Sequence, residues 1–229
     1  MPEFHSLKQY DVDLDVFHAN VLRMGCMVEN QLDNAVTCFR NRDLILTESV
    51  IGTLQEVNRL EITLDSECRR LIVRHQPTAN DLRVVMGTNK VVSDLERIGD
   101  EVRKIALSAK DLHLSSEPKS IAHQDMLNQL AGLTITIVHN ALDMFARLDA
   151  TYSDDLISEE GIITMKFRFL SKRLIDEMTD VWRAEPATLN VLWTIKALER
   201  ITDYAKNIAE QVIFIVDGKD VRHAKIEAA

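Results

Sequence analysis

Apolar side chains recur at three- and four-residue spacing through most of the 229-residue chain, which is typical of amphipathic α-helices. Polar breaks at 41–43, 75–81, 111–118 and 183–186, with Gly218 as a stop, separate these stripes. The pattern predicts six helices: 13–41, 44–74, 78 to between 111 and 118, 121–148, 154–182, and a last one ending near 218. The chain is therefore expected to be all-α.

One hexapeptide occurs twice. Leu95-Glu96-Arg97-Ile98-Gly99-Asp100 returns 103 residues later as Leu198-Glu199-Arg200-Ile201-Thr202-Asp203. In both copies the Leu and the Ile belong to the apolar stripe of their helix. The repeat predicts two tandem three-helix bundles, with residues 1–115 forming the first and residues 116–229 the second.

Composition narrows the class of protein. Hydrophobic residues make up 46% and charged residues 28%, which indicates a folded chain, and the few Gly, Pro and aromatic residues argue against a β-sandwich or a barrel. The net charge of −9 makes nucleic acid an unfavourable partner. Three cysteines without a CxxC pair suit a reducing compartment. No apolar window approaches the ~20 residues of a membrane span, so we expect a cytoplasmic protein that meets membranes only through partners.

Paired acids are the candidate chemistry. Glu96 and Asp100 stand four residues apart on a helix and well over ~100° from its apolar seam, so both carboxylates share one outer face. The first two helices carry similar pairs, Glu29 with Asp33 and Glu61 with Asp65. Carboxylate oxygens bind Mg²⁺, Mn²⁺ or Ca²⁺, and also Fe or Zn. The alternative is that these acids are merely solvated, as exposed acids usually are. Repetition of the pattern in both halves favours ion binding.

Catalytic machinery is not evident in the sequence. The seven histidines show neither HxxxH nor ExxH spacing, so a ferritin-type di-iron centre would lack its usual ligands. We find no Ser-His-Asp, Cys-His or Walker-type motif. The sequence therefore predicts no catalytic residue and no organic cofactor.

The repeated motifs resemble those of the PhoU family over nearly the whole chain. The residues that carry the resemblance are Gln76-Pro77-Thr78-Ala79, Asp94-Leu95-Glu96-Arg97-Ile98-Gly99-Asp100, Leu198-Glu199-Arg200-Ile201 and Asn207-Ile208-Ala209-Glu210. The resemblance implies two three-helix bundles related by an internal pseudo-twofold, often dimeric. It also implies metal ions bound on the acidic helix faces, of a divalent or transition type such as Mg, Mn, Fe or Zn.

The function implied by the resemblance is regulatory. A protein of this kind is a negative regulator of the phosphate regulon. It couples the high-affinity phosphate ABC transporter, through its ATPase subunit, to a phosphate-sensing histidine kinase by protein–protein contacts. The family motif carries over at nine acidic positions: Glu29, Asp33, Glu61, Asp65, Asp94, Glu96 and Asp100 in the first half, and Glu199 and Asp203 in the second.

The second half departs from this pattern. Aligning the halves places Ile135 opposite Glu29, His139 opposite Asp33 and Lys166 about opposite Glu61. We therefore expect an intact acidic cluster in the first bundle and a degraded or absent one in the second. Two other functions are left open at this point: a metal-dependent enzyme or metal-storing protein on a helical bundle, and a plain helical scaffold with solvated acidic faces.

Overall fold

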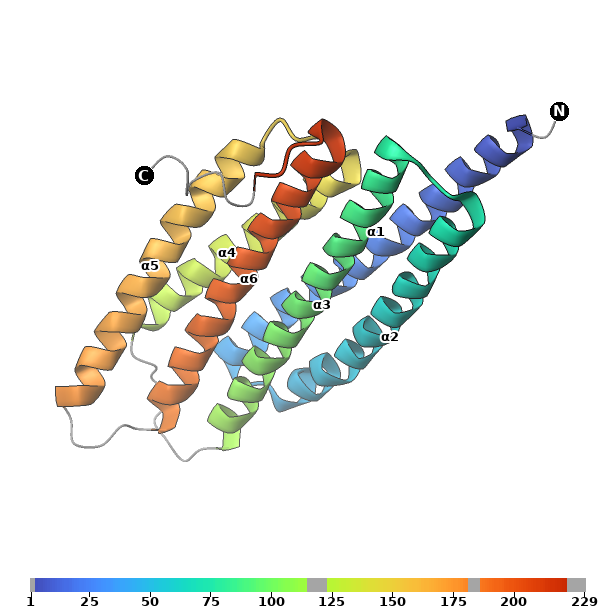
Figure 1. The fold of residues 1–229 in the computed structure, drawn as a ribbon. Helices are drawn as coiled ribbons and strands as arrows, with labels where there is room; N and C mark the ends of the chain where they lie inside the picture. The colour runs from blue at the N-terminus through green and yellow to red at the C-terminus, as the bar shows by residue number, and fades with distance from the viewer. Residues whose placement is uncertain (1–2, 115–122, 181–185, 222–229) are drawn as a thin grey trace.

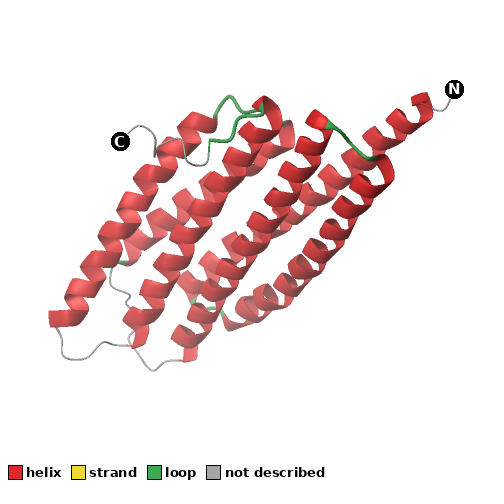
Figure 2. Ribbon diagram, in the orientation of Figure 1, coloured by secondary structure: helices red, strands yellow, loops and turns green. Residues whose placement is uncertain are grey.

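A computed structural model describes residues 3–114, 123–180 and 186–221 (Figure 1). These residues form six α-helices and no strand (Figure 2), which confirms the all-α prediction. The helices are α1 (Glu3–Asn41), α2 (Leu44–His75), α3 (Ala79–Leu114), α4 (Gln124–Arg147), α5 (Ser153–Asp180) and α6 (Pro186–Asp217). None of the helices in the described ranges has both the length and the apolar composition needed to cross a bilayer.

The helix α1 begins ten residues earlier than the sequence predicts, at Glu3 rather than Asp13. Contacts with the end of α2 hold this part of α1 at Tyr10 and Asp13. The ring of Tyr10 lies edge-on to His75 at a centroid distance of 5.5 Å, and His75 Nε2 lies 2.9 Å from Asp13 Oδ2. These contacts join residues more than 60 positions apart, so the local pattern of the sequence does not reveal them.

Recognisable residues mark the helix ends. Asp43 caps α2 by accepting a bond from the backbone N–H of Leu46 at 3.0 Å. Gln76 ends α2 in the left-handed conformation before Pro77, which disfavours a helical residue ahead of it. Pro186 starts α6, where its missing N–H costs nothing. The predicted end of the fifth helix at Trp182 and the predicted bundle boundary after residue 115 lie outside the described residues.

The apolar seams of the two halves correspond position by position. On α3, Leu95, Ile98 and Val102 are buried, and their counterparts 103 residues later on α6 are buried as well. The same holds for α1 and α4 at a spacing of 106 residues, for example Phe39 and Phe145. The predicted core positions of the repeat are thus confirmed.

The helices form two three-helix bundles, α1–α3 and α4–α6, that lie against each other (Figure 1). The helices α3 and α6 pack side by side along the middle and run in opposite directions, as expected for a pseudo-twofold axis perpendicular to them. Gly87 allows this close approach, because a Cβ there would lie 2.5 Å from Ile215 Cγ1. The buried apolar residues of both bundles form one continuous core.

Candidate functional site

Four of the predicted acids gather between α2 and α3: Glu61 and Asp65 on α2, and Glu96 and Asp100 on α3. We call them the α2–α3 acidic group. Partial burial raises the pKa of Glu61, and the charges of Asp65 and Asp100 raise it further. Burial likewise raises the pKa of Glu96, with Asp100 and Glu61 adding to the effect. The two helices therefore hold these carboxylates close enough to repel one another.

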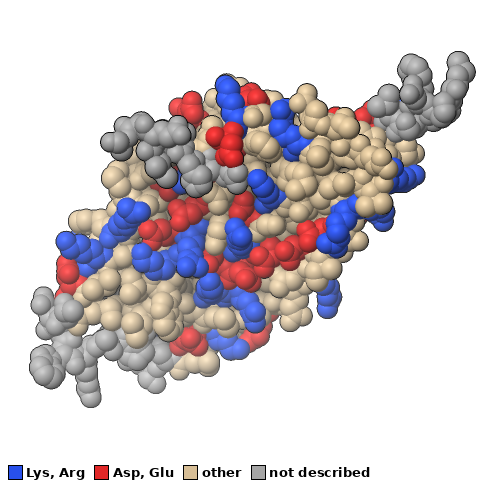
Figure 3. All heavy atoms as spheres, viewed as in Figure 1, with Lys and Arg blue, Asp and Glu red and all other residues tan. Residues whose placement is uncertain are grey.

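Little positive charge compensates the α2–α3 acidic group. No Lys, Arg or His nitrogen in the described ranges lies within 4.0 Å of the carboxylates of Glu61, Glu96 or Asp100, and Asp65 has only an exposed pair with Arg69 at 3.7 Å. Figure 3 shows a band of Asp and Glu side chains across the middle of this face, from α3 toward α2. Within the described part of the chain, no three His, Cys, Asp or Glu side chains are placed to hold a metal ion. The four carboxylates lie near one another and are of a type that binds metal ions, but they do not form a closed coordination sphere.

The acid pair on α1 is not part of this group. Glu29 Oε1 lies 2.7 Å from His139 Nδ1 on α4, so this carboxylate links the two bundles. Asp33 is exposed. Neither residue contributes to the pKa shifts of Glu61 and Glu96. His139, which the sequence places opposite Asp33, is therefore a partner of Glu29 in the structure.

Asp94 lies in a different place again, in a cleft of about 460 Å³ between α3 and α6. Its side chain is almost fully buried and pairs with Arg97 at 3.5 Å. Burial raises the pKa of Asp94 to about 6, although a hydrogen bond from Asn207 opposes the shift; the charge of Glu210 adds to it. Asp94 thus faces α6 rather than the α2–α3 acidic group.

This raised pKa predicts a pH-dependent stability. Between about pH 4 and pH 6 the folded chain holds a proton on Asp94 that the unfolded chain has lost, so the free energy of unfolding falls as pH rises through this window. A pKa difference of this size corresponds to roughly 3 kcal/mol. Asp94→Asn is expected to flatten that part of the profile in urea titrations, whereas the exposed Asp33→Asn control follows the wild type. An unaltered profile in Asp94→Asn would contradict the assignment.

The second half has an acidic group of its own between α5 and α6. Its members are Glu160, Glu199 and Asp203, and the charges of Glu160 and Glu199 raise the pKa of Asp203 after burial. The sequence alignment that places Lys166 opposite Glu61 is wrong. Buried residues of α2 and α5 correspond at a spacing of 99, as in Leu64 and Ile163, and this register puts Glu160 opposite Glu61. Lys166 is exposed on the outer side of α5.

Cations compensate the α5–α6 acidic group. Glu199 pairs with Lys196 at 2.6 Å and with Arg168 at 3.8 Å, and Glu160 lies 3.5 Å from the Nζ of Lys206. Thr164, which stands opposite Asp65 in the α5 register, donates a hydrogen bond to Glu160 at 2.7 Å. The two halves therefore keep similar acids but differ in what surrounds them.

A further buried acid, Glu101, escaped prediction from the sequence. Its Oε1 accepts from Lys104 at 2.7 Å and from Arg200 of α6 at 3.2 Å, and the residue is only 3% exposed. Because Arg200 belongs to the second copy of the hexapeptide, this pair ties the two bundles together across the α3–α6 contact. Glu101 therefore has a structural role, since its carboxylate is already paired with both Lys104 and Arg200.

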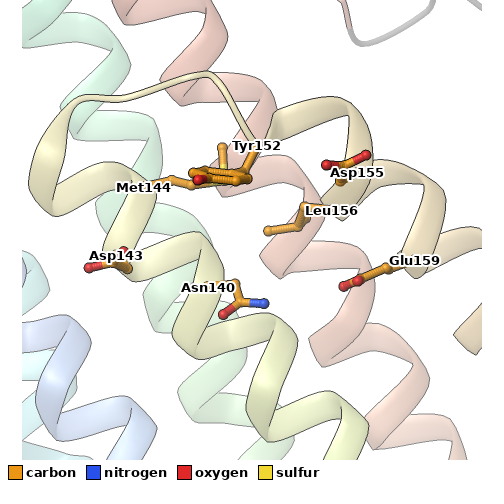
Figure 4. Close-up of a pocket in the computed structure, with 7 residues that line it drawn as sticks. All are labelled: Asn140, Asp143, Met144, Tyr152, Asp155, Leu156 and Glu159. Atoms are coloured by element: carbon orange, nitrogen blue, oxygen red, sulfur yellow. The ribbon is translucent and has the colours of Figure 1, made fainter.

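A hollow of about 330 Å³ lies between α4 and the start of α5 (Figure 4). Tyr152, Met144 and Leu156 form its apolar wall. Asp155 and Glu159 project from α5, with Asp143 across the hollow on α4, so the carboxylates do not meet at one point. No His, Ser, Cys or Lys is among the described residues that line it. This hollow therefore lacks the Ser–His or Cys–His pair of a serine or cysteine hydrolase.

Comparison with known proteins connects this architecture to one family. The family model for the PhoU domain matches the chain twice, over residues 21–109 and 127–212. A Burkholderia protein named phosphate-specific transport system accessory protein PhoU homolog is 35% identical over 227 residues, which cover 99% of this chain and 97% of that protein. The phosphate-specific transport system accessory protein PhoU from Escherichia coli K12 is 36% identical over 222 residues, which cover 96% of this chain and 90% of that protein.

Solved structures agree with the sequence matches. The crystal structure of PhoU from Pseudomonas aeruginosa superposes with a TM-score of 0.87 at 34% identity, covering 92% of this chain and all of that one. The phosphate transport system regulatory protein PhoU from Streptococcus pneumoniae gives a TM-score of 0.83 at 26% identity, covering 93% and 99%. The two-bundle arrangement is thus shared with both crystal structures.

Proposed function

Because the chain belongs to the PhoU family, we propose that it is an accessory and regulatory protein of a phosphate-specific transport system. The observation that carries this proposal is the extent of the match. Relatives named for that role align with 96–99% of this chain and with 90–97% of their own length, so both repeats have counterparts.

The regulator acts through protein–protein contacts and catalyses no reaction. One partner is the ATPase subunit of the phosphate ABC transporter, and the other is a phosphate-sensing histidine kinase that is kept inactive when phosphate is plentiful. Long helices with exposed polar faces suit such docking, and the relatives are named as accessory or regulatory proteins rather than as enzymes. The working unit is a homodimer in the cytoplasm.

The α2–α3 acidic group binds a divalent or transition cation as part of this function. Glu61, Asp65, Glu96 and Asp100 offer oxygen ligands only, which suits a hard cation such as Mg²⁺ or Mn²⁺. Support comes from their mutual repulsion and from the lack of a cation within 4.0 Å of three of them in the described residues. A bound cation supplies the missing positive charge and draws α2 and α3 together. The α5–α6 acidic group, already paired with Lys and Arg, is the weaker site.

Deletion of the gene tests the regulatory proposal. Without the negative regulator the kinase is no longer inhibited. A phosphate-starvation reporter in phosphate-replete cells is therefore expected to reach the level of starved wild-type cells. Reporter activity in high-phosphate and low-phosphate medium is the measurement. The control is the deletion strain that carries the full-length gene in trans, which should silence the reporter again. A reporter that stays silent in the phosphate-replete deletion strain would sink the proposal.

A further inference from the structure

The outer side of α5 carries large apolar side chains that face solvent. Ile162 is 51% exposed, Met165 62% and Phe169 60%. Four cationic residues lie on the same three turns: Lys166, Arg168, Lys172 and Arg173, all exposed. We call these seven residues the α5 outer patch.

The patch is directed away from the rest of the protein. At 100° per residue, Met165 and Phe169 lie on the opposite side of α5 from the buried Phe167 and Leu174. Among the described helices, α5 packs only against α4 and α6, and Figure 1 shows it at the outer edge of the molecule. No other described helix covers these apolar side chains.

The internal repeat shows that the fold does not require this patch. In the register that aligns α2 with α5, the counterparts of Ile162, Met165 and Phe169 are Thr63, Ser66 and Arg70. The first bundle is therefore polar at these three positions, although Val73, the counterpart of Lys172, is exposed. Exposed apolar residues on α5 need a reason other than helix packing.

Between Ile162 and Arg173, α5 carries four cationic side chains and no acidic one, with Glu159 and Asp176 flanking this stretch. The Nζ atoms of Lys166 and Lys172 have no acidic partner within 4.0 Å among the described residues, whereas Arg168 and Arg173 have long pairs, with Glu199 at 3.8 Å and Glu177 at 3.4 Å. Figure 3 shows Lys and Arg side chains over α5. A local excess of cations on a chain of net charge −9 marks this face as different from the rest of the surface.

We propose that the α5 outer patch docks the protein onto an anionic lipid surface. Met165 and Phe169 enter the boundary between headgroups and acyl chains, while the flanking cations bind lipid phosphates. A protein partner is less well matched, because the patch is the ridge of a single helix and its two lysines are of a type depleted at protein–protein interfaces, whereas its Met, Phe and Arg residues suit either partner. The sequence predicts membrane contact only through partners, so direct lipid contact is an additional property. It does not depend on the proposed regulatory function.

Vesicle co-sedimentation of the full-length protein tests this inference. Vesicles of phosphatidylcholine with one-quarter phosphatidylglycerol are expected to pellet the protein, and pure phosphatidylcholine vesicles are not. Each cation near an anionic surface contributes roughly a fivefold gain in binding, so Lys166→Glu with Lys172→Glu should weaken binding by more than tenfold. Met165→Ser with Phe169→Ser should weaken it as well. The matched control, Arg69→Glu with Arg70→Glu, makes the same charge change on α2 and is expected to bind normally.

Several outcomes would overturn the inference. One is equal pelleting with both kinds of vesicle, and another is an equal loss of binding in the α2 control. A third has two parts: the pure protein does not bind either kind of vesicle, and the α5 charge variant no longer associates with membranes that contain the transporter, whereas the α2 control still does. That result would assign the patch to an acidic protein partner. Circular dichroism and thermal unfolding of each variant confirm that these exposed substitutions leave the fold intact.

Discussion

Replacing Leu95 with alanine is expected to lower the free energy of unfolding by about 3 kcal/mol, within the range for leucine-to-alanine changes in well-packed cores. Leu95 is fully buried in the middle of α3, where the two bundles share their core. Its counterpart Leu198 is 1% exposed, so Leu198→Ala should cost a similar amount. Urea unfolding followed by circular dichroism measures both.

The neighbouring residue provides the matched control. Glu96→Gln removes one charge from the α2–α3 acidic group, and relief of repulsion is expected to raise the free energy of unfolding by up to about 0.5 kcal/mol. The pKa of Glu96 is raised in the folded state, so its charge destabilises the native protein at neutral pH, and the gain should shrink on acidification as the wild-type Glu96 becomes protonated. If Leu95→Ala and Glu96→Gln changed stability equally, the division of the hexapeptide into core and surface positions would be wrong.

The sequence predicts most of the fold because helical periodicity is a local property. The buried positions of α3 and α6, such as Ile98 and Ile201, follow from spacing alone. The early start of α1 does not, because Tyr10 and Asp13 are held by His75 across a long stretch of sequence. Contacts between distant residues leave no trace in a periodic pattern.

The candidate site is harder to predict for the same reason. A spacing of four residues places Glu29 and Asp33 on one face of a helix but does not tell which helix that face meets. In the structure Glu29 meets His139 of α4, and Asp94 meets Asn207 of α6. Among the acid pairs predicted in the first half, only those on α2 and α3 come together. The spacing of 99 residues between the apolar seams of α2 and α5 was the signal that could have identified Glu160.

The two acidic groups differ less in the number of their acids than in how many of the carboxylates are paired with Lys or Arg. In the second half, Glu199 forms ion pairs with Lys196 and Arg168, and Glu160 forms one with Lys206. A metal ion would have to displace these cations from the carboxylates. In the first half, burial raises the pKa of Glu61 and of Glu96, and neighbouring carboxylates, Asp65 and Asp100 for Glu61 and Asp100 and Glu61 for Glu96, raise them further. An incoming cation therefore gains more free energy at the α2–α3 acidic group.

This difference leads to a second prediction of large effect. Glu96→Gln with Asp100→Asn is expected to weaken Mn²⁺ binding by about 100-fold or more, since even the loss of a group that only supports a metal ligand costs up to that amount. Glu199→Gln with Asp203→Asn changes the same residue types at the equivalent turn of α6 and should leave that affinity nearly unchanged. Isothermal titration calorimetry of the three proteins with Mn²⁺ measures the difference.

The same variants connect the cation to regulation. If the cation is needed for the brake on the kinase, a strain with Glu96→Gln and Asp100→Asn should express the phosphate-starvation reporter in phosphate-replete medium, while the α6 variant stays silent. The α3 substitutions lie outside the core and relieve repulsion, so a loss of stability would not explain reporter expression in that variant. A silent reporter in the α3 variant would mean that the acids are merely solvated. Stronger Mn²⁺ binding at Glu199 and Asp203 than at Glu96 and Asp100 would reverse the assignment. It would mean that the free energy needed to displace Lys196 is smaller than the free energy gained by relieving the repulsion between Glu61 and Glu96.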